Sequence, residues 1–295
     1  MNEKGGNAAL NGYLLGLAGV IAFGGTLPAT RILVMNVDPV LITLARASIA
    51  GLAAMALLAA GRIPMLPPRA EWPGLAIVIA ALVLGFPLLM ALAMAHVPAS
   101  HGAVMLGILS LATAAAGCLF SPERPSLAFW LVGALGSATV ICFALRQGGG
   151  AISFADLALL AAVVSAGIGY AKGAALTARL GGWRVTCWVV VICLPVTVPA
   201  TLWMAWLDPP DLSARDGAAL AYIALISQLL AFLPWYIGLA MGGIAPVSQL
   251  MLLLPFVTIA FGHFLIGEAL DDATISFCLA VAVIVLIGKR MPIRA

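Results

Sequence analysis

Long apolar runs, hardly interrupted by charge, are the feature that most limits what this chain can fold into. A helix needs about 20 apolar residues to cross a hydrocarbon core of roughly 30 Å, and turn and charge signals divide the sequence into ten such runs. Hydrophobic residues fill 64% of the 295 positions and charged residues 8%, whereas soluble domains are about 45–50% apolar and 25% charged. The sequence therefore predicts a polytopic membrane protein with spans at 12–33, 40–60, 72–94, 98–120, 127–145, 154–172, 184–205, 217–240, 245–267 and 274–288.

The ninth of these runs has a weaker copy about half a chain earlier. Segment 243–268 reads GIAPVSQLMLLLPFVTIAFGHFLIGE, and segment 98–123 reads PASHGAVMLGILSLATAAAGCLFSPE. Each copy has a small or Pro-containing start, an uncharged apolar middle and a Gly before a final Glu. The offset is constant, since Glu268 aligns with Glu123 at 268 − 123 = 145. We infer that one unit is used twice.

Each unit holds five spans, and five is an odd number, so the second unit must enter the membrane from the opposite side. The predicted fold is an all-α membrane protein with ten transmembrane helices arranged as two inverted five-helix repeats. The repeats are expected at residues 1–148 and 149–295. The first run continues for a full span, so we expect it to be retained as the first helix and not removed as a signal peptide.

Basic residues in the loops predict the orientation. With the N-terminus in the cytoplasm, nine Lys and Arg residues lie on the cytoplasmic side and three on the other side. This asymmetry follows the positive-inside rule, so both termini should be cytoplasmic. The net charge of +3 and the scattered basic residues do not favour a nucleic-acid partner. The nine are Lys4, Arg62, Arg69, Arg124, Arg179, Arg184, Lys289, Arg290 and Arg294; the three are Arg31, Arg146 and Arg215.

Helix-breaking residues recur at corresponding places in the two repeats. Gly25 in the first span falls on Gly169 in the sixth, at 169 − 25 = 144. Such residues either allow close helix packing through small side chains or mark a bend that lines a cavity. The candidate hinge or gating residues are Gly25, Pro28, Pro87, Gly169, Pro234, Pro246 and Pro255.

Arg46 is the costliest side chain in the sequence to place in a membrane. It lies six residues inside the second span, and a central Arg costs about 2.5–3.5 kcal/mol on insertion scales. The side chain either extends to the interface or bonds backbone carbonyls, or it faces the bundle interior and attracts a substrate carboxylate.

Other polar residues in the spans are candidates for substrate hydrogen bonds. Gln228 lies near mid-membrane, where an amide must find a partner, as an interhelical contact or in a binding site. His101 corresponds to Pro246, at the start of the ninth span, where Ser248 and Gln249 follow. A helix start of this kind leaves unpaired donors that can face a cavity.

Four apolar or aromatic residues are candidates for contact with the apolar part of a substrate: Phe86, Met90, Tyr170 and Trp235. Methionine adapts to irregular apolar ligands, although it more often simply packs. An aromatic belt at the inner interface is the alternative for Trp235 and Tyr236. Lys172 near the cytoplasmic edge either extends to the interface or faces inward toward an anionic group.

The eleven acidic residues all fall in loops or at span ends. Membrane ion-coupling sites generally need a carboxylate within the span, so coupling through Asp or Glu is not expected. Glu123 and Glu268 are expected to stabilise the N-terminus of the following span through its dipole. The five Cys residues show no metal-ligand spacing, and no cofactor or metal is predicted.

The chain resembles the drug/metabolite transporter superfamily, of the EamA-domain type. The resemblance rests on ten spans in two inverted repeats, on the ninth-span signature APVSQLMLLLPFVTIAFGHFLIGEAL at 245–270 and on the Arg in the second span. It implies a bacterial inner-membrane exporter that works by alternating access around a central cavity. In the first repeat, His101 and Ser110 replace Pro246 and Pro255, so the two halves need not bend alike.

We therefore predict a secondary transporter that exports small amphipathic metabolites, in particular neutral or aromatic amino acids. Its partners are expected to be a small-molecule substrate and the lipid bilayer, with the chain a monomer or a weak homodimer. Enzyme activity is not predicted. The alternatives are an intramembrane lipid-modifying enzyme and a transporter of another drug or metabolite class.

Overall fold

Helices account for almost all of the structure, a computed structural model that describes residues 3–120, 124–147, 151–243, 247–269, 271–289 and 293–294. In the first repeat the helices are α1 (Glu3–Gly24), α2 (Thr26–Leu33), α3 (Pro39–Ala60), α4 (Trp72–Val78), α5 (Phe86–Met94), α6 (Ala99–Met105), α7 (Leu109–Phe120) and α8 (Leu127–Gln147). The second has α9 (Phe154–Leu180), α10 (Gly182–Leu207), α11 (Ala214–Ala221), α12 (Phe232–Gly242), α14 (Leu254–Ile266) and α15 (Asp272–Lys289). Two short strands, β1 (Arg124–Pro125) and β2 (Ile293–Arg294), pair antiparallel.

Several of the helical segments are long and apolar enough to cross a membrane. Six continuous segments among the described residues meet this condition, and a pair bent by 44° (Ala99–Ile108 and Leu111–Phe120) makes a seventh. Three shorter apolar helices lie in the fifth, ninth and tenth expected spans. The chain is therefore a multi-pass membrane protein, and the count of ten spans stays a prediction. The six segments are Leu10–Leu33, Pro39–Ala60, Arg69–Met94, Phe154–Leu180, Gly182–Leu207 and Ala214–Gly242.

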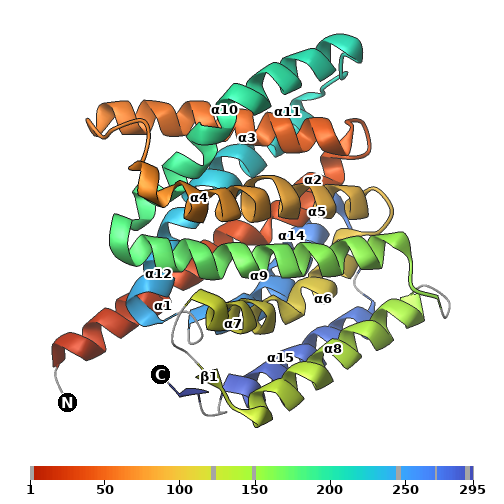
Figure 1. Ribbon diagram of the computed structural model, residues 1–295. Helices are drawn as coiled ribbons and strands as arrows, with labels where there is room; N and C mark the ends of the chain where they lie inside the picture. The colour runs from red at the N-terminus through yellow and green to blue at the C-terminus, as the bar shows by residue number, and fades with distance from the viewer. Residues whose placement is uncertain are drawn as a thin grey trace.

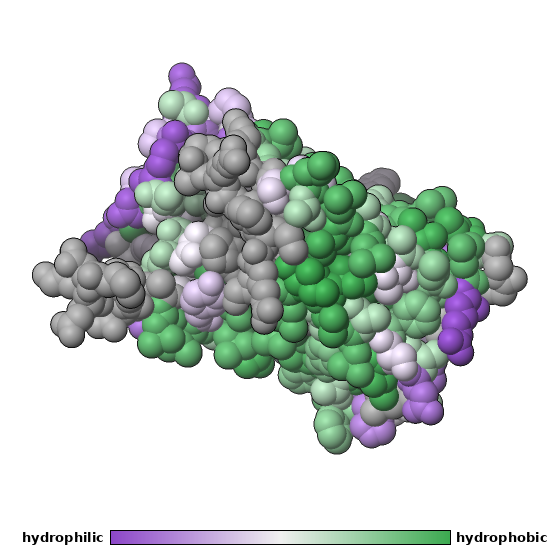
Figure 2. All heavy atoms as spheres, turned by 90° about the horizontal axis from the view of Figure 1, so that it is seen from below, coloured by the Kyte–Doolittle hydropathy of each residue, from purple (hydrophilic) through white to green (hydrophobic). Residues whose placement is uncertain are grey.

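The surface has the pattern expected of a membrane protein. Figure 2 shows a broad hydrophobic band between two ends that carry hydrophilic residues. Large apolar side chains such as Leu131, Trp206 and Phe264 are exposed, which is the arrangement that lipid contact requires. In Figure 1, α1 begins and α15 ends at the same end of the bundle. We call this the inner end and the opposite one the outer end, in line with the predicted orientation.

The helix contacts repeat when the two halves of the chain are exchanged. Helix α3 packs against α10, its counterpart, and α8 packs against α15, its counterpart (Figure 1). The contact of α1 with α12 has its equivalent in the contact of α9 with α5, and that of α1 and α2 with α14 in that of α9 with α7. A pseudo-twofold relation between the halves produces this pattern.

The first span is interrupted at Gly25, between α1 and α2. The Tyr222 hydroxyl donates a hydrogen bond of 2.8 Å to the carbonyl of Ala22, the residue three positions before the break. A Cβ at Gly25 would lie 2.6 Å from the same hydroxyl oxygen. At Gly25, close packing against Tyr222 and a break in the span, the two alternatives that the sequence left open, therefore occur together. Pro28 lies in the first turn of α2, where its missing N–H is tolerated.

The third and eighth spans each contain a π-helical turn just before their proline. These turns are η2 (Ile79–Gly85), ahead of Pro87, and η4 (Tyr222–Leu230), ahead of Pro234. Proline lacks an N–H and clashes with the carbonyl four residues earlier, and the wider turn relieves that conflict. In η2 the Ala81 carbonyl accepts the backbone N–H of Phe86 and also a hydrogen bond of 2.8 Å from the Ser165 hydroxyl of α9.

The fourth and ninth spans are interrupted at equivalent positions. A 3₁₀ turn, η3 (Leu106–Ile108), precedes α7, and another, η5 (Gln249–Leu253), precedes α14. The helices after them begin at residues 109 and 254, which differ by 254 − 109 = 145. Pro255 occupies the first turn of α14, whereas the equivalent residue in the fourth span is Ser110. The interruption therefore does not depend on a proline. Gly169, by contrast, lies within the continuous helix α9.

Candidate functional site

Arg46 faces the interior of the bundle. The residue is 2% exposed, and one of its terminal nitrogens donates a hydrogen bond of 3.2 Å to the Ser227 hydroxyl of η4. Its Nε has no hydrogen-bond partner among the described residues. The guanidinium has five N–H donors, and no Asp or Glu among the described residues forms a salt bridge with it. Arg46 therefore presents a buried positive charge with unused donors.

A short chain of hydroxyl groups positions this guanidinium. Ser227 Oγ lies 2.8 Å from Thr26 Oγ1, at the start of α2. Because Ser227 accepts from Arg46, its own hydroxyl proton is available for Thr26. Thr26 and Ser227 are both buried. The break in the first span and the π turn of the eighth thus meet at Arg46.

A small cavity lies beside these groups. Arg46, Thr26, Ser227, Gln228 and Tyr170 all line it. Gln228 is 3% exposed, and its Oε1 accepts no hydrogen bond from the described residues. The cavity volume is about 10 Å³, which is room for about one water molecule. The structure is therefore closed around a cationic and hydrogen-bonding centre.

A cluster of buried aromatic side chains adjoins this cavity. Phe23 and Phe232 line the cavity, and their ring centroids lie 4.9 Å apart in an edge-to-face arrangement. Tyr170 packs against Trp235 at 5.6 Å, and Phe232 against Tyr236 at 5.4 Å. Trp235 and Tyr236 are 0% and 1% exposed, so the aromatic-belt interpretation is wrong for both. We call the cluster of Phe23, Tyr170, Phe232, Trp235 and Tyr236 the aromatic wall.

The other residues predicted to contact substrate lie in different places. Phe86 lines the cavity; Met90 and Ser248 are buried outside its lining. The Lys172 ammonium lies 4.9 Å from the centroid of the Phe120 ring, away from the cavity. Pro246 and the Gln249 side chain are outside the described residues. The roles assigned to these residues stay predictions.

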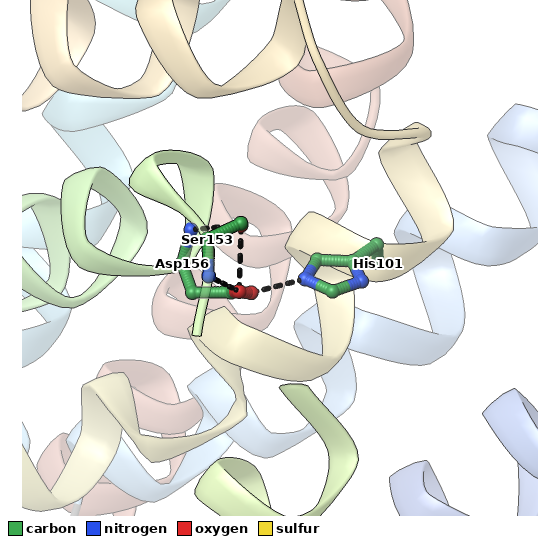
Figure 3. Close-up of polar contacts among 3 residues, drawn as sticks. All are labelled: His101, Ser153 and Asp156. Carbon is green, nitrogen blue, oxygen red and sulfur yellow. Dashed lines mark hydrogen bonds and ion pairs between the residues drawn. The ribbon is translucent and has the colours of Figure 1, made fainter. Parts of the chain in front are cut away.

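His101 lies at the outer end, away from the central cavity. Its Nε2 is 2.7 Å from Oδ1 of Asp156, in the first turn of α9 (Figure 3). Asp156 is 1% exposed and also accepts hydrogen bonds from the backbone N–H and the hydroxyl of Ser153, at 2.8 and 2.6 Å. Both residues line an outer cavity of about 580 Å³.

Glu268 stabilises a helix of the other repeat. Its two carboxylate oxygens accept hydrogen bonds from the backbone N–H groups of Ala99 and Ser100, at 2.8 and 3.0 Å. These groups open α6, so the carboxylate caps a helix 169 residues earlier and not the span that follows it. The position of Glu123 lies outside the described residues.

The structure places in these clusters three residues that were not among the sequence-based candidates: Thr26, Ser227 and Asp156. Thr26 lies within the Gly-Gly-Thr-Leu-Pro segment at residues 24–28, and Ser227 directly precedes Gln228. The only sign of their role in the sequence is that each is a neighbour of a candidate residue. Asp156 forms a capping box with Ser153, a motif that explains a carboxylate locally and gives no sign of a distant histidine.

Comparisons with known proteins agree with this architecture. The model of the EamA-like transporter family matches residues 10–145 and again 153–288. The chain is 41% identical over 288 residues to "Uncharacterized transporter YdeK" of Bacillus subtilis (strain 168), covering 96% of this chain and 99% of that protein. It is 23% identical over 276 residues to a "Probable terminal-alkyne amino-acid exporter" of Streptantibioticus cattleyicolor, covering 92% and 91%.

A solved structure described only as a crystal structure of a protein has the same fold. It superposes with a TM-score of 0.66 at 18% identity, over 92% of this chain and 97% of that one. The two family matches together cover most of the chain, one in each half. On this evidence, the chain belongs to the EamA-like transporter family of the drug/metabolite transporter superfamily, with two EamA domains.

Proposed function

We propose that this transporter exports small amphipathic carboxylates, in particular neutral and aromatic amino acids, across the bacterial inner membrane. The observation that carries the proposal is Arg46, which is buried and has a single hydrogen bond among the described residues. A charged group in the interior of a membrane protein is costly unless it is paired. A substrate carboxylate that binds Arg46 through paired N–H donors offsets that cost.

The rest of an amino acid finds suitable groups around the same cavity. Gln228 Oε1 is an unused acceptor that fits an ammonium group. Phe86, Phe232 and Tyr170 line the cavity and offer apolar surface to a large side chain. A relative at 23% identity carries a name that describes amino-acid export, which supports the same substrate class.

The closed state of the site supports a mechanism of alternating access. A cavity of about 10 Å³ does not admit an amino acid, so substrate entry requires the surrounding helices to separate. The breaks at Gly25 and the π turns ahead of Pro87 and Pro234 lie in the segments that form the cavity. We infer that these positions act as hinges. The aromatic wall opens toward the inner end, and the α6 side opens toward the outer end.

The test is counterflow of radiolabelled amino acids into proteoliposomes that contain the purified protein. Phenylalanine should drive counterflow and phenylalaninol, which lacks the carboxylate, should not. Arg46→Gln should weaken phenylalanine binding by about 10–100-fold, the equivalent of about 1.5–3 kcal/mol for a hydrogen bond to a charged group. The same variant should lose the discrimination between the two compounds.

Arg62→Gln is the matched control, because Arg62 is an exposed arginine in the loop after α3. It should transport like the natural protein. Equal competition by phenylalanine and phenylalaninol in the natural protein would contradict a carboxylate site, whatever the folding of the Arg46 variants. Counterflow of other metabolites but of no amino acid would leave a transporter with a different substrate class.

A further inference from the structure

The structure contains a buried acid–base pair that the central cavity does not use. His101 Nε2 and Asp156 Oδ1 are 2.7 Å apart, and the two residues are 6% and 1% exposed (Figure 3). They belong to different repeats, since His101 lies in α6 and Asp156 in α9. Their contact ties the outer ends of these two helices together.

The hydrogen bonds define where the protons are. Oδ2 of Asp156 accepts from the backbone N–H and from the hydroxyl of Ser153. The Ser153 hydroxyl oxygen in turn accepts from the backbone N–H of Asp156 at 3.2 Å. One proton therefore lies between Oδ1 and Nε2. Nδ1 of His101 has no hydrogen-bond partner among the described residues, so it is the position open to a second proton.

His101 and Asp156 both line a cavity of about 580 Å³ at the outer end. Its titratable residues are His101, Asp156, His96, Glu268 and Asp271, and no Lys or Arg is among the described residues that line it. Phe143 of α8, which does not line this cavity, packs against the imidazole with ring centroids 5.0 Å apart. The cavity therefore brings three carboxylates, those of Asp156, Glu268 and Asp271, to the same lining as the imidazole.

We propose that His101 and Asp156 form a proton-binding site that couples a proton from the outer compartment to the movement of α6. A second proton at Nδ1 turns the pair into an imidazolium–carboxylate ion pair, and hydrogen bonds between charged groups are stronger than neutral ones. Proton binding therefore strengthens the contact between α6 and α9. By linkage, the state with a closed outer end binds the proton more tightly than the open state.

Helix α6 connects this site to the substrate cavity. Leu106, five residues after His101, and Leu109 line the central cavity. Gly102, the next residue after His101, packs so closely on Leu27 that a Cβ there would lie 2.5 Å from its Cδ2. Leu27 also lines the central cavity. A displacement of α6 at His101 therefore moves one wall of the substrate site.

Proton binding can be measured without any substrate. The chain has three histidines, so NMR of protein labelled with ¹⁵N-histidine in nanodiscs gives signals that single substitutions assign. The signal lost in His101→Gln should shift as the pH is lowered, because the imidazole takes up the second proton. Asp156→Asn should lower its midpoint by about one pH unit or more. His96→Gln, a histidine in the same cavity, should leave the midpoint unchanged. A His101 signal that does not titrate, or an unchanged midpoint in Asp156→Asn, overturns the site.

Coupling to transport rests on the proposed function and is measured separately, by counterflow with equal pH on both sides. The natural protein should run several-fold slower at pH 5.5 than at pH 8, because the proton stabilises the closed outer end. His101→Gln keeps an N–H donor for Asp156 but cannot titrate, so its rates should be equal at the two pH values, and His96→Gln should behave like the natural protein. A pH-independent natural protein, or a persistent pH effect in His101→Gln, refutes the coupling. Protein whose His101 titrates but that moves no amino acid refutes the proposed substrate and leaves the proton site standing.

Discussion

Glu268 Oε1 accepts a hydrogen bond of 2.8 Å from the backbone N–H of Ala99, across 169 positions of sequence. Oε2 accepts from the next backbone N–H, that of Ser100. The first N–H groups of a helix have no partner within it, so one carboxylate from the second repeat caps the helix that carries His101. This arrangement makes the outer end of α6 depend on both repeats.

Replacement of Glu268 should loosen α6. Glu268→Ala removes both acceptors and should lower the free energy of unfolding by about 1.5–3 kcal/mol, the value of hydrogen bonds to a charged group. Thermal unfolding of purified protein in detergent measures the loss. Glu71→Gln is the control, because its partner Arg179 is 64% exposed and an exposed ion pair contributes about 0–1 kcal/mol. Equal losses in the two variants would contradict the capping role.

Ser227→Ala removes the one hydrogen-bond partner that Arg46 has among the described residues. The guanidinium then loses its acceptor while buried, and we expect a loss of about 1–3 kcal/mol in the free energy of unfolding. A substrate that binds Arg46 should restore part of that loss, because ligands stabilise the state they bind. Unfolding temperatures with and without saturating phenylalanine measure both effects. Ser48→Ala, which removes a hydroxyl that bonds Leu44 and Thr201 elsewhere, should show no larger gain from phenylalanine than the natural protein.

Gly238 allows α12 to approach α1 closely. A Cβ at this position would lie 2.7 Å from the Gly12 carbonyl oxygen and 2.8 Å from the Gly16 nitrogen, and backbone atoms of a helix cannot move aside cheaply. Gly238→Ala should therefore destabilise the protein by about 1–3 kcal/mol. In contrast, nothing lies within 4 Å of a Cβ at Gly217 in α11. Gly217→Ala should stabilise by about 0.5–1 kcal/mol, the usual gain within a helix.

Two hydroxyl groups donate hydrogen bonds to backbone carbonyls beside interruptions of the helices. Tyr222 bonds the Ala22 carbonyl near the break in the first span, and Ser165 bonds the Ala81 carbonyl in η2. Tyr222→Phe and Ser165→Ala should each cost about 0.5–1.5 kcal/mol, measured by thermal unfolding. The double variant should lose the sum of the two values, because the two sites share no partner. A cost near zero in both would mean that the carbonyls find other donors.

Local signals were enough to locate most of the helices. The second expected span, 40–60, matches α3 at Pro39–Ala60, and the third, 72–94, ends with α5 at Met94. Asp38 and Pro39 mark the start of α3, where the aspartate side chain accepts from two backbone N–H groups. At Gly25 the sequence left two alternatives open, close helix packing or a bend, and the structure shows close packing at a break in the span. Hydropathy and helix-end chemistry act over a few residues, so they are visible in the sequence.

The site depended on contacts that no local signal carries. Arg46 and Ser227 are 181 positions apart, and His101 and Asp156 are 55 apart. Sequence reasoning identified Arg46 as costly but left its direction open, because a long side chain can reach the interface as well as the interior. Asp156 is a residue at the end of a span, as the sequence indicates. That position gives no sign of its hydrogen bond with His101.

The π turns in the third and eighth spans also determine which way the following residues point. Each such turn holds one residue more than an α-helical turn would, and one residue corresponds to a rotation of about 100° around the helix axis. Trp235 and Tyr236 follow η4, so their place in the aromatic wall depends on that additional residue. Deletion of a single residue from η4 would turn both rings toward other neighbours. These spans should therefore accept substitutions within the π turns more readily than any change in their length.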